Sequence, residues 1–101
     1  MKLLSITKSP MAKKKWRAFF EHDGHGSGLG KTRFHTDFGA EGYKDFTQGA
    51  SPERAVLYRL RHEKDLRTDN PTRAGYLSYY ILWSSPDFEA NVRRYKNKFH
   101  L

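Results

Sequence analysis

The sequence predicts an α+β fold: a small antiparallel β-hairpin packed on about three short α-helices. Two stretches, at residues 15–21 and 32–38, alternate apolar and polar side chains as half-buried strands do. Two serine–proline pairs, at residues 51–52 and 85–86, are typical of helix starts. The length of 101 residues fits one domain, and aromatic residues, 15% of the chain, supply most of its core.

The two strands are expected to form one hairpin. Its inward side chains are Trp16, Ala18 and Phe20 on the first strand, with Phe34, Thr36 and Phe38 on the second. The loop at residues 22–30 contains four glycines and serves as a long turn between the strands. Because an isolated hairpin is barely stable in water, we expect helices to cover its apolar face.

Three helices are expected to follow. The first runs from Pro52 to about Arg67, with an apolar side formed by Val56, Leu57 and Leu60. The second spans residues 72–83 and is apolar almost all round, which makes it the central element; a strand is the alternative for this aromatic run. The third follows Pro86 and carries an apolar stripe: Phe88, Val92, Tyr95 and Phe99.

Positive charge is concentrated at the start of the chain. The net charge is +8, and residues 1–17 hold six lysines and arginines with no acidic residue. We therefore expect a basic N-terminal arm at residues 1–14, separated by Pro10 from a single domain at residues 15–101. Such an arm attracts nucleic acid or an acidic protein surface. The alternative is a frayed, solvated terminus.

The candidate partner-binding residues are the cations of the arm and of the outer hairpin face, with one tryptophan between them. They are Lys8, Lys13, Lys14, Lys15, Trp16, Arg17, Lys31 and Arg33. Cations interleaved with aromatic rings suit single-stranded nucleic acid, since the charges bind phosphate and the rings stack on bases. The same residue types serve protein docking, and Trp16 has a place in the core as its alternative.

No chemistry of a known enzyme class emerges. The segment Gly26–Thr32 approaches a phosphate-binding loop, but the required first glycine is His25 and a strand follows where a helix is needed. Cysteine is absent, which excludes thiolate metal sites. His22, Asp23, His25, His35 and Asp37 could gather around the hairpin, yet polar surface residues explain them better than a metal site. We expect a non-enzyme with no catalytic residue, metal, cofactor or small-molecule substrate.

No apolar run is long enough for a membrane span, and the start of the chain becomes polar too soon for a secretory signal. The expected location is therefore the cytoplasm or nucleus of a cell, or a particle assembled there.

Several segments together resemble one family. They are residues 38–47, which include Gly42-Tyr43-Lys44-Asp45-Phe46-Thr47, and residues 58–63, 70–78, 82–83 and 99. This pattern resembles a family of small, basic, uncharacterised proteins of large DNA viruses of algae and amoebae, and of some phages. The glycine-rich turn at residues 22–30 departs from the short turn of that family.

The resemblance implies a viral origin and brings no catalytic residues. The expected function is that of a non-enzymatic virion protein, a minor capsid or internal protein whose basic arm bridges neighbouring subunits or the genome. Its expected partners are other virion or capsid proteins and DNA or RNA, and its expected location is the virion, with host cytoplasm or nucleus during assembly. The alternative is a small nucleic-acid-binding protein that uses the arm and the hairpin face.

Overall fold

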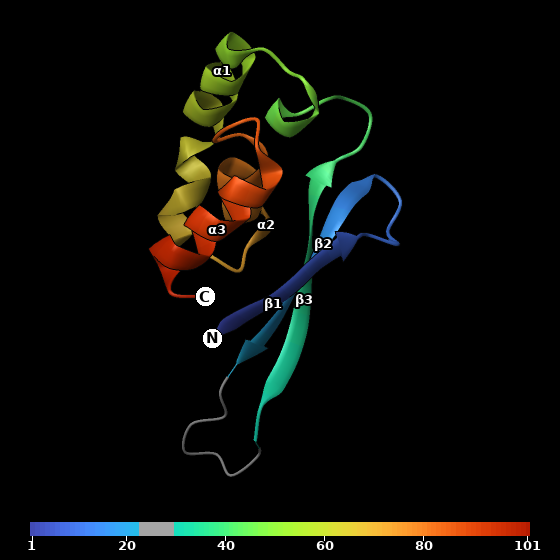
Figure 1. Cartoon of the computed structure of the whole chain (residues 1–101), viewed down its shortest axis with the longest axis vertical. Helices are drawn as coiled ribbons and strands as arrows, with labels where there is room; N and C mark the ends of the chain where they lie inside the picture. Colours follow the sequence, from blue (N-terminus) through green and yellow to red (C-terminus); the bar gives the residue numbers. More distant parts are fainter. Residues whose placement is uncertain (23–29) are drawn as a thin grey trace.

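A three-stranded antiparallel sheet opens the chain. The computed structural model describes residues 1–22 and 30–101. The strands are β1 (Lys2–Lys8), β2 (Lys14–His22) and β3 (Thr32–Ala40), in the order β1-β2-β3. Figure 1 shows the helices gathered on one side of this sheet, while part of the β2–β3 hairpin extends beyond them. The predicted α+β class is confirmed, with one strand more than expected.

The additional strand shows that the expectation of a separate N-terminal arm at residues 1–14 is wrong. Residues 2–8 pair with β2 across the register Lys2–Glu21 to Lys8–Trp16, with an irregularity between Leu3 and Ser5. Leu3 is 3% exposed, and its N–H donates to the carbonyl of Leu101 at 3.3 Å. Alternation is weak in this segment, because lysines and a bulge interrupt its apolar residues. Residues 1–14 are therefore part of the domain.

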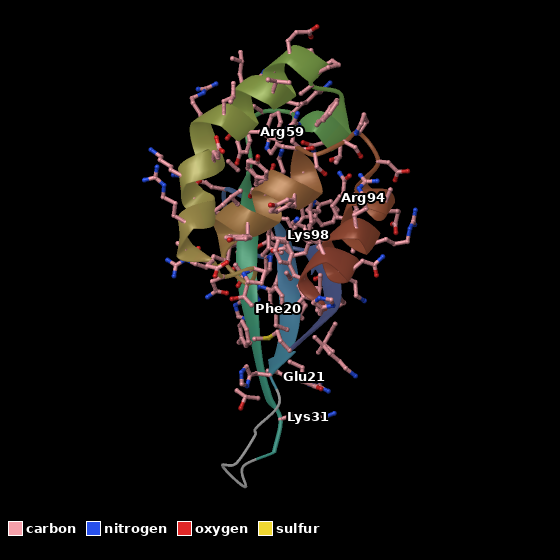
Figure 2. All side chains as sticks on the ribbon, turned by 90° about the vertical axis from the view of Figure 1, so that its left-hand side faces the viewer. Phe20, Glu21, Lys31, Arg59, Arg94 and Lys98 are labelled. Carbon is pink, nitrogen blue, oxygen red and sulfur yellow. The ribbon has the colours of Figure 1, made fainter. Side chains whose placement is uncertain are left out.

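The two faces of the sheet differ as the alternation predicted. Ala18, Phe20 and Phe38 are fully buried beneath the helices, and Phe20 stacks on Phe34 with ring centroids 5.3 Å apart. The opposite face carries ion pairs between Arg17 and Asp37 and between Arg33 and Glu21. In Figure 2, Glu21 and Lys31 lie on the part of the hairpin beyond the helical layer.

The helical half begins with the 3-10 helix η1 (Phe46–Gln48) and helix α1 (Pro52–His62), which continues as the 3-10 helix η2 (Glu63–Thr68). Ser51 caps α1 by accepting from the Arg54 N–H at 3.2 Å. The expected orientation of this helix is wrong: Ala55 is buried, whereas Val56, Leu57 and Leu60 are exposed. The helix packs through its small and aromatic side, because Tyr58 contacts Trp83 there.

The central element is one helical run with two geometries. Helix α2 (Ala74–Leu77) widens into the π-helix η3 (Ser78–Leu82), and helix α3 (Phe88–Phe99) follows. Leu77, Ile81 and Leu82 are almost fully buried, which confirms its central place as a helix. Buried Asn91 of α3 donates to the carbonyls of Ile81 at 2.8 Å and Ser85 at 2.9 Å. This amide therefore satisfies the carbonyl groups left where η3 ends.

A buried lysine joins the sheet to the helical half. Lys15 Nζ donates to Asp45 Oδ2 and the Tyr43 carbonyl, both at 2.9 Å, and to Gln48 Oε1 at 2.6 Å. The side chains of Lys15 and Asp45 are only 7% and 1% exposed. The expectation of Lys15 as a partner-binding cation is therefore corrected: its charge is used inside the domain.

Glycine makes room for this lysine. Gly39 lies opposite Lys15 with φ of +82°, and a Cβ placed there would be 2.9 Å from Leu82 Cδ1 and 3.2 Å from Lys15 Cβ. Both the conformation and the close approach require glycine at this position. The lysine side chain can thus pass beside β3 and reach the segment that precedes α1.

Substitution of two neighbouring leucines tests whether residues 2–8 form a packed strand or a free arm. We expect Leu3→Ala to lower the free energy of unfolding by about 2–4 kcal/mol, because a buried side chain is removed. Leu4→Ala is the matched control: Leu4 is 42% exposed, and the change should cost less than about 1 kcal/mol. Urea denaturation of both variants measures the difference. Equal, negligible effects would mean that residues 2–8 are not packed.

The buried ion pair makes a second test. Lys15→Met should lower the free energy of unfolding by about 3–5 kcal/mol, because it leaves the Asp45 carboxylate buried without its cation. Lys14→Met, at the exposed neighbouring position, should change it by less than about 0.5 kcal/mol. The double variant K15M/D45N should be more stable than K15M, since it removes the buried negative charge. If the free energies of unfolding of K15M and K14M agreed within error, the result would contradict the buried ion pair between Lys15 and Asp45.

Candidate nucleic-acid interface

The segment before α1 is held rigidly beside the sheet. Asp45 Oδ1 accepts the Thr47 N–H at 2.9 Å, and Gln48 Oε1 accepts the Asp45 N–H at 3.2 Å, which forms a capping box around η1. The Ala50 N–H donates to the Asp45 carbonyl at 3.0 Å. Because Lys15 binds the same Asp45 and Gln48, the backbone of Tyr43 and the start of α1 have fixed positions.

Three aromatic rings form a continuous stack next to this segment. Tyr58 lies nearly parallel to His62, with ring centroids 4.1 Å apart, and to Trp83, with centroids 4.3 Å apart. Two rings at these distances cannot share one face of Tyr58, so His62 and Trp83 cover opposite faces. Trp83 is buried at one end, while His62 is partly exposed at the other. The stack therefore presents an open aromatic surface at its His62 end.

The aromatic cleft, as we call it, consists of two adjoining depressions of about 240 and 270 Å³. Both are lined by Tyr43, Tyr58, His62 and Trp83. The Tyr43 side chain is 47% exposed and stands at the mouth of the cleft. A planar, apolar group can therefore enter against ring faces that the fold already holds in place.

Cations surround these rings. Arg54 Cζ lies 5.7 Å from the Tyr43 ring centroid, and the second depression is also lined by Arg61. Lys14 lines the first depression, with Asp65 as an acidic neighbour whose Oδ2 is 2.9 Å from His62 Nδ1. Burial raises the pKa of Tyr58 to about 12, so that phenol is neutral at physiological pH. The charged side chains that line the cleft are therefore four cations, Arg54, Arg61, Lys14 and Lys15, and one carboxylate, Asp65.

Of the exposed lysines predicted from the sequence, Lys14 lines the cleft. Lys8, Lys13 and Lys14 are exposed around the turn between β1 and β2, and none forms an ion pair within residues 1–22 and 30–101. The Lys13 carbonyl accepts the Glu41 N–H at 3.0 Å, which holds this turn against the segment that carries Tyr43. Lys14 thus adds a positive charge to the cleft, while Lys8 and Lys13 are exposed on and beside the turn that precedes it in the chain.

The other predicted residues lie elsewhere. Trp16 is half-buried against Phe88, with ring centroids 4.9 Å apart, as its alternative core role predicted. Arg17 is paired with Asp37, and this guanidinium lowers the pKa of the carboxyl to about 2. Lys31 and Arg33 both pair with Glu21, at 3.4 and 3.0 Å. The outer hairpin face therefore neutralises most of its own charge.

The hypotheses of a metal site and of a phosphate-binding loop involve residues that lie partly outside the described chain, namely Asp23, His25 and residues 26–29. Within residues 1–22 and 30–101, no three His, Cys, Asp or Glu side chains gather in a way that could hold a metal. Thr32 begins strand β3, as the alternation predicted. No helix of the described chain is long and apolar enough to cross a membrane.

Sequence reasoning missed the residues at the centre of the cleft. One face of α1 carries four residues at helical spacing: Arg54, Tyr58, Arg61 and His62. The prediction for this helix was based instead on the apolar residues of its other face. Trp83, at the end of the predicted central helix, is buried, and its indole also ends the aromatic stack. The spacing of Arg54, Tyr58 and Arg61 was the one feature of the sequence that could have indicated this site.

Comparisons with known proteins leave the function open. No curated protein matches the chain, and neither does any solved structure. A family model matches residues 4–62, a stretch that includes most of β1, all of β2 and β3, and α1. The chain therefore belongs to a family of unknown function, DUF5754.

Proposed function

We propose that this protein binds single-stranded nucleic acid in the aromatic cleft, as a binding protein without catalysis. The observation that carries the proposal is the stack of Trp83, Tyr58 and His62, which opens beside Tyr43 with Arg54 and Arg61 at its edge. Rings for base stacking and cations for phosphate, in one groove, are the two components that single-strand binding requires.

The geometry favours an unpaired strand over a duplex. In a duplex, each base already has neighbours on both faces, so it cannot stack on the exposed side of His62 or Tyr43 without unpairing. In a single strand, a base enters the cleft while its phosphates face Arg54, Arg61 and Lys14. Lys8 and Lys13, on the adjacent turn, would then contact phosphates further along the strand.

The cations give the first measurable consequence. We expect the double variant R54A/R61A to bind a fluorescent oligonucleotide of about ten nucleotides at least about tenfold more weakly than the unmodified protein. The slope of log K against log salt should become shallower by about 1.4, because two phosphate contacts are lost and each contributes about 0.7 in a single strand. Fluorescence anisotropy at several salt concentrations measures both quantities.

The matched control is Arg93→Ala, which removes an exposed arginine of α3 outside the cleft and should leave both quantities nearly unchanged. Tyr43→Ala separates stacking from charge: it should weaken binding by about fivefold or more without changing the salt slope. A loss of binding free energy and of salt slope for R93A that is about half that of R54A/R61A would show that binding follows total charge rather than the cleft, since R93A removes one charge and the double variant two.

A virion structural role is the second candidate, and the exposed leucines of α1 favour it. We propose it in a changed form: since residues 2–8 are held in the sheet, subunits or the genome would be contacted by the surface of the domain rather than by a free arm. Capsid or other virion proteins would be the partners, in the virion and in the host compartments where it assembles.

Mass spectrometry of purified virus particles tests this second role. A structural protein should be present at a stoichiometric copy number relative to the major capsid protein. Its absence, or trace amounts that nuclease and high-salt washing remove, would leave nucleic-acid binding as the function.

A further inference from the structure

A separate depression with aromatic walls lies between η3 and α3. This tyrosine hollow, as we call it, has a volume of about 210 Å³ and shares no lining residue with the aromatic cleft. Its lining residues are Tyr80, Ser84, Asn91, Arg94, Tyr95 and Lys98. Asn91 and Tyr95 are each 1% exposed and form the floor, while Tyr80 is half-buried and both cations are exposed. The hollow therefore has a neutral floor, an aromatic wall and a positive rim.

The polar atoms of the floor are already paired. The Asn91 amide donates to two backbone carbonyls, and its Oδ1 accepts from Ser85 Oγ at 2.5 Å. The Ser84 hydroxyl donates to the Tyr80 carbonyl. Within residues 1–22 and 30–101, no buried side-chain nitrogen or oxygen lacks a hydrogen-bond partner. A flat, largely apolar group can therefore enter this hollow without displacing a hydrogen bond.

The two rim cations are positioned without an acidic partner. Arg94 Nη2 donates to Ser85 Oγ at 3.0 Å and to Asn91 Oδ1, and both acceptors are neutral. Lys98 lies four residues later on the same side of α3, with Nζ 5.9 Å from the Tyr80 ring centroid. Neither cation forms an ion pair within the described parts of the chain. Because like charges at this spacing repel each other, an anion held between them is bound favourably.

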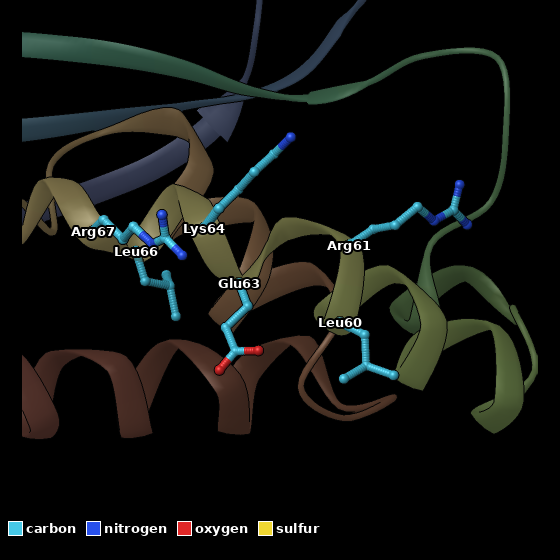
Figure 3. A pocket seen from close by; sticks show the side chains of 6 residues that line it. All are labelled: Leu60, Arg61, Glu63, Lys64, Leu66 and Arg67. Atoms are coloured by element: carbon cyan, nitrogen blue, oxygen red, sulfur yellow. The ribbon is translucent and has the colours of Figure 1, made fainter.

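A larger groove, of about 570 Å³, lies beside α1 and η2 and has a different composition. Figure 3 shows Glu63 in this groove near Leu60, with Lys64 directed to the opposite side. No aromatic ring lines it, and a carboxylate stands among its cations. It lacks the combination of ring and uniformly positive rim that the tyrosine hollow has.

The order of floor, wall and rim selects the ligand. A nucleotide enters with its base first, so the base packs on Tyr80 while the phosphate stays at the rim beside Arg94 and Lys98. A phosphorylated tyrosine enters with its phosphate first and would need cations at the floor. We infer that the tyrosine hollow is a second nucleotide site, which holds one nucleotide either free or as part of a strand. The inference does not depend on the proposed function, because the two sites share no residue.

Adenosine monophosphate (AMP) is the probe, and NMR of the isotope-labelled full chain measures its binding residue by residue. We expect the amide signals of Ser84, Asn91 and Tyr95 to shift along one saturating curve, with a dissociation constant on the order of millimolar. Adenosine, which lacks the phosphate, should bind at least about fivefold more weakly. Free O-phosphotyrosine should also bind more weakly than AMP, since its phosphate and ring cannot reach rim and wall in the same order.

Charge-matched variants test the rim. R94Q/K98Q should weaken AMP binding by about tenfold, and K98Q alone, which leaves the hydrogen bonds of Arg94 intact, by about threefold. R93Q/K96Q is the matched control, because it removes two exposed cations of the same helix outside the hollow; binding should stay within about twofold. R54A/R61A, altered only at the aromatic cleft, should keep these amide shifts, so the failure of one site is distinguishable from failure of the other. The spectrum of each variant also shows whether it is folded.

An oligonucleotide of about ten nucleotides separates the two sources of the ligand. If a strand occupies the hollow, the same amides shift and R94Q/K98Q weakens that binding; if only the free nucleotide does, they shift with AMP alone. Four results would overturn the inference: no shift of these amides up to about 10 mM AMP, equal affinity for adenosine and AMP, tighter binding of O-phosphotyrosine than of AMP, or equal losses for R94Q/K98Q and R93Q/K96Q.

Discussion

The buried ammonium group of Lys15 is the constraint on which the arrangement of this domain depends. A charge removed from water must be fully paired, and here three acceptors from residues 43–48 surround it. Any displacement of that segment from the sheet would expose the ammonium group to water or leave it buried without its acceptors. The capping box at Asp45, the backbone of Tyr43 and the start of α1 therefore share one position relative to β2. The strong positive charge of the N-terminal region thus has two uses, since Lys15 organises the fold while Lys8, Lys13 and Lys14 stay in water.

Local chemistry made most of the fold predictable. The alternation in β2 and β3 and the Ser51–Pro52 start of α1 each act within a few residues, and they hold in the structure. The pair Ser85–Pro86 only precedes a helix, because α3 begins at Phe88 with Asp87 as its cap. Strand β1 was missed because its place depends on distant partners. Leu3 is buried only because β2 lies beside it and Leu101 accepts its N–H. The orientation of α1 was wrong for a related reason: its most apolar side faces outward, which no rule based on the helix alone can show.

The candidate site was less predictable, because it is assembled from three separate segments. Tyr43, Tyr58 and Trp83 come together only through the Lys15 pairing and the packing of α1 on the central helix. Charge counting found Lys14, which lines the cleft, but it could not tell a cation in solution from one already paired. Arg17, Lys31 and Arg33 are occupied by acidic neighbours across the sheet. Pairing across strands depends on register, which the sequence specifies only weakly in charged stretches.

The π-helix at residues 78–82 has a consequence for how this domain can change over evolution. A π-turn holds one residue more than an α-turn. Losing that residue would restore a regular helix and turn everything after it by about 100°. Trp83 would then leave the aromatic stack, and Asn91 would lose the carbonyls of Ile81 and Ser85. A chain that lacks this residue would therefore retain the sheet but not the cleft.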